Sequence, residues 1–145
     1  MLNSKSFGYA VRGLLFLTLQ NNHSKYILLE SISRNINAPK HFLAKIFRKL
    51  AEADLVDSVK GPKGGFRANE KTLHTSLWEV LMVTDPLDPF NHCILKWKKC
   101  NSKRPCPLHH QVVPVKNQLI ELLHNTEIKD LMSKNKKEIL DQILE

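Results

Sequence analysis

A single stretch decides the fold of this chain: Leu55-Val56-Asp57-Ser58-Val59-Lys60-Gly61-Pro62-Lys63-Gly64-Gly65-Phe66. Apolar and polar residues alternate over residues 55–59, which is typical of a half-buried strand, and residues 66–68 read as a second strand. The glycines between them permit positive φ angles and a close approach of the backbone to a surface. Lys60 and Lys63 place positive charge at the tip. The stretch therefore predicts a basic β-hairpin.

An amphipathic helix is predicted directly before this hairpin, ending near Ala53. Its apolar face is made by Leu43, Ile46, Phe47, Leu50 and Ala53, and its polar face by His41, Lys45, Arg48, Lys49 and Glu52. Pro39 stands in the first turn, where proline is tolerated because those amides have no acceptor within the helix. Charged residues on a helix often only solvate its outer face, and this helix alone leaves that interpretation open.

Two further helices are predicted on the N-terminal side. Residues 6–20 carry apolar side chains at helical spacing, and a shorter helix is expected around residues 30–35, before a tight break at Asn37-Ala38-Pro39. A short helix, a turn and a basic helix have the order of a DNA-binding helix-turn-helix. A glycine-rich basic hairpin after it is what a wing that touches phosphates or a minor groove requires. The sequence thus predicts a winged helix-turn-helix DNA-binding domain over residues 1–75.

The charge of the chain is gathered in this first half. The formal net charge is +8, and residues 1–75 hold 12 Lys and Arg against 5 Asp and Glu, whereas residues 76–145 hold 10 against 9. Such an imbalance is expected of a nucleic-acid-binding module, although a merely soluble basic surface would give the same numbers. No apolar run approaches the roughly 18 residues of a membrane span, and the N-terminus has no signal-peptide pattern. We therefore expect a cytoplasmic protein with no membrane partner.

Residues 76–145 predict a helical dimerisation region. Ser76-Leu77-Trp78-Glu79 is a capping box that opens a helix to about Val83. A long helix is marked by Val112, Val115, Leu119, Leu122 and Leu123, with Pro114 as its start or a kink. Thr126 is expected to cap a further helix, and residues 139–144 form a last apolar stripe. The long helix has more apolar surface than a small winged helix covers, which favours a subunit partner; packing on its own domain is the alternative.

All three cysteines, Cys93, Cys100 and Cys106, lie in an aperiodic segment between these helices, the cysteine loop (about residues 90–110). Thiolates ligate iron–sulfur clusters and zinc, and an imidazole can complete the set; His109 follows Cys106 at ligand spacing. The loop holds several lysines and an arginine but no acid, which favours the thiolate form. Structural cysteines or an incidental cluster are the alternatives, although buried cysteine usually sits in apolar helices or strands.

An enzyme is not expected. The chain has no Cys-x-x-Cys redox pair, no nucleotide-binding glycine pattern before a helix and no obvious triad spacing. The glycine-rich hairpin is not a phosphate-binding P-loop either, because it lacks the Gly-Lys-Ser/Thr ending and opens onto a strand.

Taken together, these features resemble the IscR/NsrR-type winged-helix repressors. Tyr9-Ala10-Val11, the stretch 55–66 and the position of the three cysteines carry the resemblance, which covers nearly the whole chain. It implies a mainly α fold, with a winged helix-turn-helix, a small β-hairpin wing and a long dimerisation helix. It also implies a homodimer that binds a pseudo-palindromic operator in double-stranded DNA. In that family, gain, loss or damage of an iron–sulfur cluster switches the affinity for DNA.

The departures from the family pattern bear on the cluster. The family's cysteine gaps are nearer five residues, and the first gap here holds six. Gly8 stands where the nitric-oxide-sensing branch has an aspartate ligand, whereas His109 matches the histidine ligand of the cluster-biogenesis regulator. The resemblance thus favours a 2Fe–2S cluster held by Cys93, Cys100, Cys106 and His109. A 4Fe–4S cluster with another fourth ligand is the alternative, and His92 and His110 are weaker ligand candidates.

The predicted DNA contacts lie on the polar helix face and the hairpin. They are Lys40, His41, Lys45, Arg48, Lys49, Lys60, Gly61, Pro62, Lys63, Gly64 and Gly65. Lys60 replaces the wing arginine of the family. The alternative function is a DNA-binding regulator that holds zinc, or whose thiols respond directly to oxidants, without a cluster.

Overall fold

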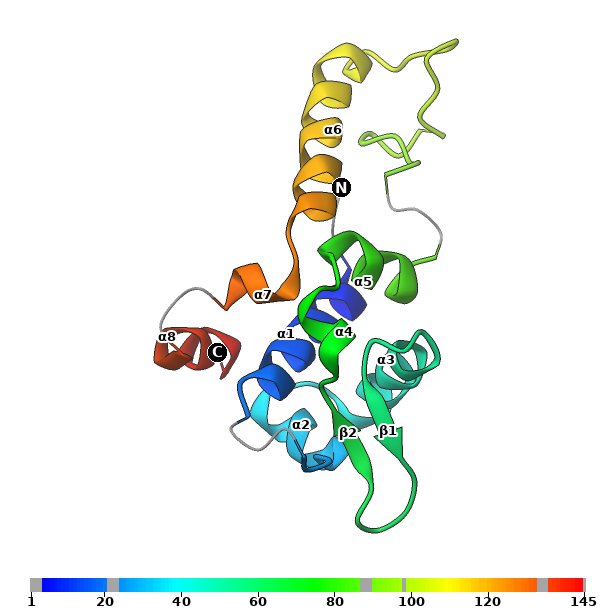
Figure 1. The fold of residues 1–145 in the computed structure, drawn as a ribbon. Coiled ribbons are helices and arrows are strands. Elements are labelled where there is room, and N and C mark those ends of the chain that lie inside the picture. Colours follow the sequence, from blue (N-terminus) through cyan, green and yellow to red (C-terminus); the bar gives the residue numbers. More distant parts are fainter. Residues whose placement is uncertain (1–3, 21–23, 87–89, 98, 133–135, 145) are drawn as a thin grey trace.

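The computed structural model describes residues 4–20, 24–86, 90–97, 99–132 and 136–144 (Figure 1). In chain order its elements are α1 (Lys5–Thr18), α2 (Leu29–Asn35), α3 (Lys40–Glu52), β1 (Asp57–Val59), β2 (Gly65–Arg67), α4 (Glu70–Leu73), α5 (Leu77–Thr84), α6 (His109–Asn125), α7 (Ile128–Leu131) and α8 (Lys136–Leu144). The predicted mainly helical fold with one small antiparallel hairpin is confirmed.

The core forms where α1, α2 and α3 meet. Its fully buried side chains include Leu14, Ile32, Leu43, Phe47 and Leu50, and each contributes roughly 1.5–3 kcal/mol by leaving water. These are apolar positions that the helical periodicity selects. A Cβ on Gly13 would lie 2.6 Å from the Phe47 ring, so the glycine lets α1 approach α3 closely.

The wing follows α3 without a linker. Asp54, with a φ of 59°, ends the helix, and the chain returns through Leu55 and Val56, which are buried in the core. Consequently β1 begins at Asp57, two residues later than predicted. Asp57 pairs with Arg67, and Val59 with Gly65.

The remaining helices extend the same core. Val80 of α5, Ile128 of α7, and Ile139 and Ile143 of α8 join the cluster around α1. The predicted capping box is confirmed: the Ser76 hydroxyl accepts from the Glu79 amide at 3.1 Å, and the Glu79 carboxylate accepts from the Ser76 amide at 2.8 Å.

Two helix starts in the second half of the chain test the predicted boundaries. The long helix begins at His109 and continues through Pro114, so of the two roles predicted for the proline, start or kink, the first is excluded. Thr126 ends α6 instead of capping α7, whose N-cap is Glu127 in a reciprocal pair with Asp130. The helix α4 was not predicted, because it is a single turn without a recognisable period.

Helix α6 extends away from the body formed by α1–α5, and the cysteine loop runs beside its N-terminal part (Figure 1). The wing lies at the opposite end of the molecule. A second, small core of Leu81, Phe90 and Leu123 joins α5, the start of the loop and α6. None of the described helices is long and apolar enough to cross a membrane.

Candidate functional site

The polar face of α3 is solvent-exposed along its length. Its exposed residues include all five predicted contacts of the helix, Lys40, His41, Lys45, Arg48 and Lys49. Lys40 lies 3.8 Å from Glu30, and Arg48 lies 3.9 Å from Glu52 one turn later on the same helix. Pairs this exposed stabilise the fold by at most about 1 kcal/mol, so they leave the cations free to exchange partners.

Residues 60–63 at the tip of the wing are exposed. The last two glycines, Gly64 and Gly65, instead pack closely against backbone atoms of the protein. Gly64 is buried, and a Cβ there would lie 2.1 Å from the Val59 carbonyl oxygen. Gly65 has a φ of 140°, and a Cβ there would lie 2.1 Å from the carbonyl oxygen of Ile27. Glycine is required at both positions by close approach within the protein, and the exposed residues at the tip, Lys60 among them, are the ones available to a partner.

A cleft of about 350 Å³ separates α3 from the wing. Arg48 of the helix and Lys60 of the wing both line it, so the two predicted basic elements border one surface. The apolar floor of the cleft includes Phe66, whose ring packs edge-on against Phe47 at 5.0 Å. Packing of these two rings fixes the hairpin against α3.

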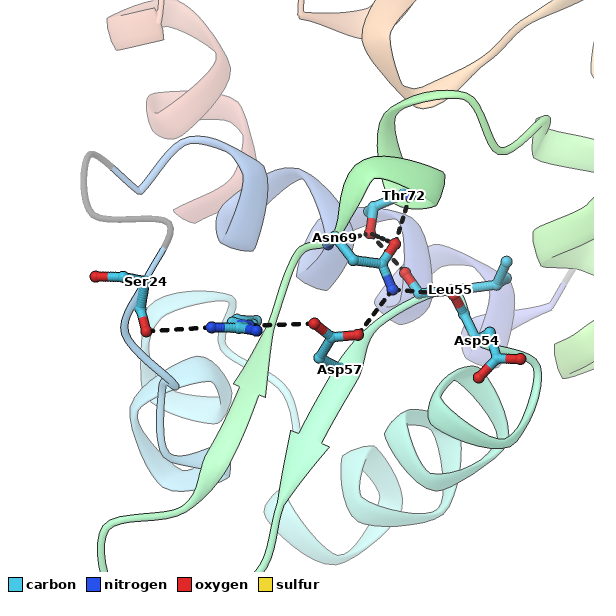
Figure 2. A network of polar contacts seen from close by, with 7 residues as sticks. Ser24, Asp54, Leu55, Asp57, Asn69 and Thr72 are labelled. Atoms are coloured by element: carbon cyan, nitrogen blue, oxygen red, sulfur yellow. Dashed lines mark hydrogen bonds and ion pairs between the residues drawn. The ribbon is translucent and has the colours of Figure 1, made fainter.

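A polar network braces the base of the wing, and sequence reasoning missed it. The Arg67 Nε donates to Asp57 Oδ2 at 3.2 Å, and its guanidinium lies over the Tyr26 ring at 4.5 Å. Figure 2 shows Asn69 turned toward Asp57 and toward the Asp54 backbone; its Nδ2 donates to both at 3.1 Å. Asp57 and Arg67 are directly opposite in the sheet, so the register of the hairpin would have revealed the pair.

The cysteine loop is anchored at its start. Phe90 is buried in the small second core, where its ring stacks on Trp78 at 6.0 Å. Beyond it, the Cys100 amide donates to the Asn91 carbonyl at 2.9 Å, and the Lys96 amide donates to the Cys93 carbonyl at 2.8 Å. The chain therefore returns at Cys100 to Asn91, next to the buried Phe90.

The four predicted ligands form two pairs. The Cys100 Sγ lies 3.5 Å from His109 Nδ1, and Cys106 lies close enough to Cys93 to lower the pKa of the Cys93 thiol. Cys93 is buried, while the other two thiols are half-buried. Within the described parts of the chain, no three His, Cys, Asp or Glu side chains converge as metal ligands would. His92 and His110 are exposed.

The thiol of Cys93 has an altered acidity. Burial raises its pKa, but backbone hydrogen bonds from Leu95 and Trp97, the hydrogen bond with Cys106 and the charge of Lys116 outweigh burial. The net result is a pKa below the ordinary value of a cysteine. The thiolate form that ligates metal and attacks oxidants is thus favoured at this position.

One edge of α6 is apolar and exposed. Val115 and Leu122 are 51% and 58% exposed, and Leu108 just before the helix is 37% exposed. These three residues, the α6 edge, recur every seven positions, as the seam of a two-helix contact does. Leu119 and Leu123 instead pack on the small second core.

Comparison with known proteins gives the family. Residues 3–134 match the Rrf2 family model, described as an iron-dependent transcriptional regulator. An HTH-type transcriptional regulator of Aquifex aeolicus is 30% identical over 96% of both chains. The HTH-type transcriptional regulator IscR of Vibrio vulnificus is 29% identical over 88% of this chain and 74% of its own.

A solved structure agrees on the fold. The global cysteine regulator CymR of B. subtilis superposes with a TM-score of 0.72 at 19% identity, covering 92% of this chain and 97% of its own. The helices and the small hairpin therefore have their counterpart in a solved structure, and the family match extends over most of the chain: the chain belongs to the Rrf2 family of winged-helix transcriptional regulators.

Proposed function

We propose that this chain is a cytoplasmic repressor that binds double-stranded DNA as a homodimer, with its DNA affinity set by an iron–sulfur cluster in the cysteine loop. The observation that carries the proposal is the pairing of Cys100 with His109 and of Cys93 with Cys106 in one loop. IscR-named relatives and a family model described as iron-dependent support it.

DNA binding is assigned to residues 1–75 in this proposal. Helix α3 would enter the major groove, and the tip of the wing, with Lys60 and Lys63, would reach phosphates or the minor groove. Two copies of α3 related by a two-fold axis would read half-sites roughly 34–36 Å apart, or a multiple of that distance, hence a pseudo-palindrome.

Dimerisation and sensing are assigned to residues 76–145. The α6 edge offers three apolar side chains at a seven-residue repeat, the spacing at which two helices bury a common seam. A long helix that extends from the body is the element a second copy can reach without disturbing the wing (Figure 1).

The donor chemistry of the cysteine loop fits a cluster. Cys93, Cys100, Cys106 and His109 would hold it, 2Fe–2S being preferred and 4Fe–4S the alternative. Two ligands on one tetrahedral metal, with metal–sulfur and metal–nitrogen bonds of about 2.3 and 2.0 Å, are separated by about 3.5 Å. Cys100 and His109 have that separation. A bound cluster would supply the reactivity toward redox changes, nitric oxide or iron–sulfur status, and the loop's exposed Lys and Arg side chains would offset its negative charge.

A second candidate function is direct thiol sensing, and the contact between Cys93 and Cys106 favours it. With peroxide as oxidant, the two thiols would lose two protons and two electrons to form a disulfide, and the peroxide would be reduced to water. Zinc held by the same thiols belongs to this alternative.

DNA affinity separates the two functions. A duplex is selected by the protein from a random pool, and its affinity is measured for the reconstituted, the metal-free reduced and the peroxide-treated protein. Cluster sensing predicts a difference of roughly 5- to 150-fold between the first two forms. If the reconstituted and metal-free proteins bind DNA equally well, and the affinity changes only after peroxide treatment, the result contradicts cluster sensing and supports thiol sensing.

A further inference from the structure

Among the lysines that the structure describes, Lys116 alone is buried, with 5% of its surface exposed. It lies in the N-terminal half of α6, one residue after the exposed Val115 of the α6 edge. A buried ammonium group is costly unless acceptors replace its water. The position of those acceptors therefore shows which part of the chain Lys116 holds in place.

Two acceptors of the Lys116 ammonium group belong to the start of the cysteine loop. The Lys116 Nζ donates to the Phe90 carbonyl and to the His92 carbonyl, the latter at 3.0 Å. The two carbonyls lie just before Cys93 in the chain. The ammonium group also lies close enough to Cys93 for its charge to act on that thiol.

The same short segment makes further contacts. Phe90 packs with Leu81 and Leu123 in the small second core, and its ring stacks on Trp78. The Asn91 carbonyl, between the two acceptors of Lys116, receives the Cys100 amide. Release of Lys116 would therefore loosen the loop at the point from which both Cys93 and Cys100 are positioned.

We propose that Lys116 is the positioning residue of the cysteine loop: it fastens residues 90–92 to α6, so that a change at the cysteines reaches the helix that carries the α6 edge. The proposal has two parts. The first part, the fastening of residues 90–92 to α6, rests on the hydrogen bonds alone. The second part, the transmission of a change at the cysteines to DNA binding, rests on the function proposed above, and each part has its own measurement.

The fastening is measured by amide hydrogen exchange of the metal-free, reduced protein, a readout that does not depend on thiol ionisation. Lys116→Met keeps the length of the side chain and removes the donors. It should speed exchange at the Lys96 and Cys100 amides by roughly tenfold or more, since two buried hydrogen bonds are lost. Amides of α3 should keep their protection, and Lys116→Arg, which retains charge and donors, should restore most of the loop protection.

Asn117→Met is the matched control, because Asn117 is the exposed neighbour on the same helix. It should leave all loop amides unchanged. If Lys116→Met does not fold, Lys116→Leu, which also lacks a donor, is measured in its place, with the same expectation. Loop exchange in the folded Met or Leu variant within about twofold of wild type would overturn the fastening.

The transmission is measured on the selected duplex as the ratio of DNA affinities between the reconstituted and metal-free proteins. In Lys116→Met the ratio should fall toward one, while the metal-free affinity stays at the wild-type level. A ratio equal to that of wild type would overturn the transmission. If wild type itself shows a ratio of one, the proposed cluster sensing fails, and the exchange data still decide the fastening.

Discussion

The Sγ atom of Cys100 lies 3.5 Å from Nδ1 of His109, the first residue of the long helix α6. The relationship joins a loop thiol to the element that extends from the body of the molecule. The amide of His109 also donates to the Cys106 carbonyl at 3.0 Å, so the same residue contacts two of the three cysteines. The start of α6 and the cysteine loop are therefore joined by two contacts of one residue.

Replacement of His109 by alanine should shorten the lifetime of a reconstituted cluster. Loss of a second-shell partner alone costs about 10–100-fold in metal affinity, and loss of a ligand should cost at least as much. Decay of the visible absorption in air measures the lifetime. His110→Ala is the control, since His110 is exposed beside it. Decay of the His109→Ala protein at the wild-type rate would remove His109 from the ligand set.

Lys60→Ala should weaken DNA binding and flatten its salt dependence. Each phosphate contact contributes about 0.9 to the slope of log affinity against log salt, because bound counterions are released. A salt series on the selected duplex measures this slope. Lys103→Ala, an exposed change in the cysteine loop, should leave it at the wild-type value. A Lys60→Ala slope equal to wild type would contradict the assignment of the wing.

Cys93 in the metal-free protein should be alkylated with a pH midpoint below the ordinary cysteine pKa of about 8.5. Burial opposes ionisation, but the hydrogen bonds from Leu95, Cys106 and Trp97 and the charge of Lys116 lower the pKa. The stabilisation from this thiolate is complete above the ordinary pKa and is lost as the pH falls through the folded value.

Mass spectrometry of each alkylated cysteine across a pH series gives the midpoint. The same series on urea-unfolded protein should return the ordinary value for all three thiols. A folded midpoint for Cys93 at or above the unfolded one would contradict the hydrogen-bonded thiolate.

In the proposed homodimer, Val115→Lys should separate the two copies into monomers. Val115 is at the middle of the α6 edge, where a pair of lysines related by two-fold symmetry would be desolvated side by side. Sedimentation at micromolar concentration measures the state. Asn117→Lys, exposed on another face of the helix, should remain dimeric. A monomeric wild type, or a dimeric Val115→Lys, would rule out this interface.

The periodicity of the sequence predicts the elements that bury a continuous stripe. Leu43, Ile46, Phe47 and Leu50 of α3 are spaced so that only one helix face can enter the core, and they do. The turn chemistry at residues 60–65 likewise predicts the wing. The single turn α4 is missed because its four residues carry no period, although Asn69 and Thr72 form a capping box that could have been read.

The sequence does not reveal the contacts of the candidate site that join residues far apart in the chain. Lys116 looks like a solvated lysine of an amphipathic helix, and its burial depends on carbonyls 24 and 26 residues away. The pairing of Cys100 with His109 depends on the turn that brings the loop back to α6. Leu55 and Val56 were predicted to begin the half-buried strand but are both buried, because the chain enters the core there before the sheet begins.

The most direct test of cluster sensing is anaerobic reconstitution with iron and sulfide, followed by visible absorption and by iron and sulfide analysis. Wild-type protein should show a visible chromophore with matching iron and sulfide content. The variant with serine at Cys93, Cys100 and Cys106 should show neither, while keeping its helical folding, because none of the three lies in the main core. Equally small iron uptake by both proteins, without visible absorption, would contradict the cluster and leave thiol or zinc sensing.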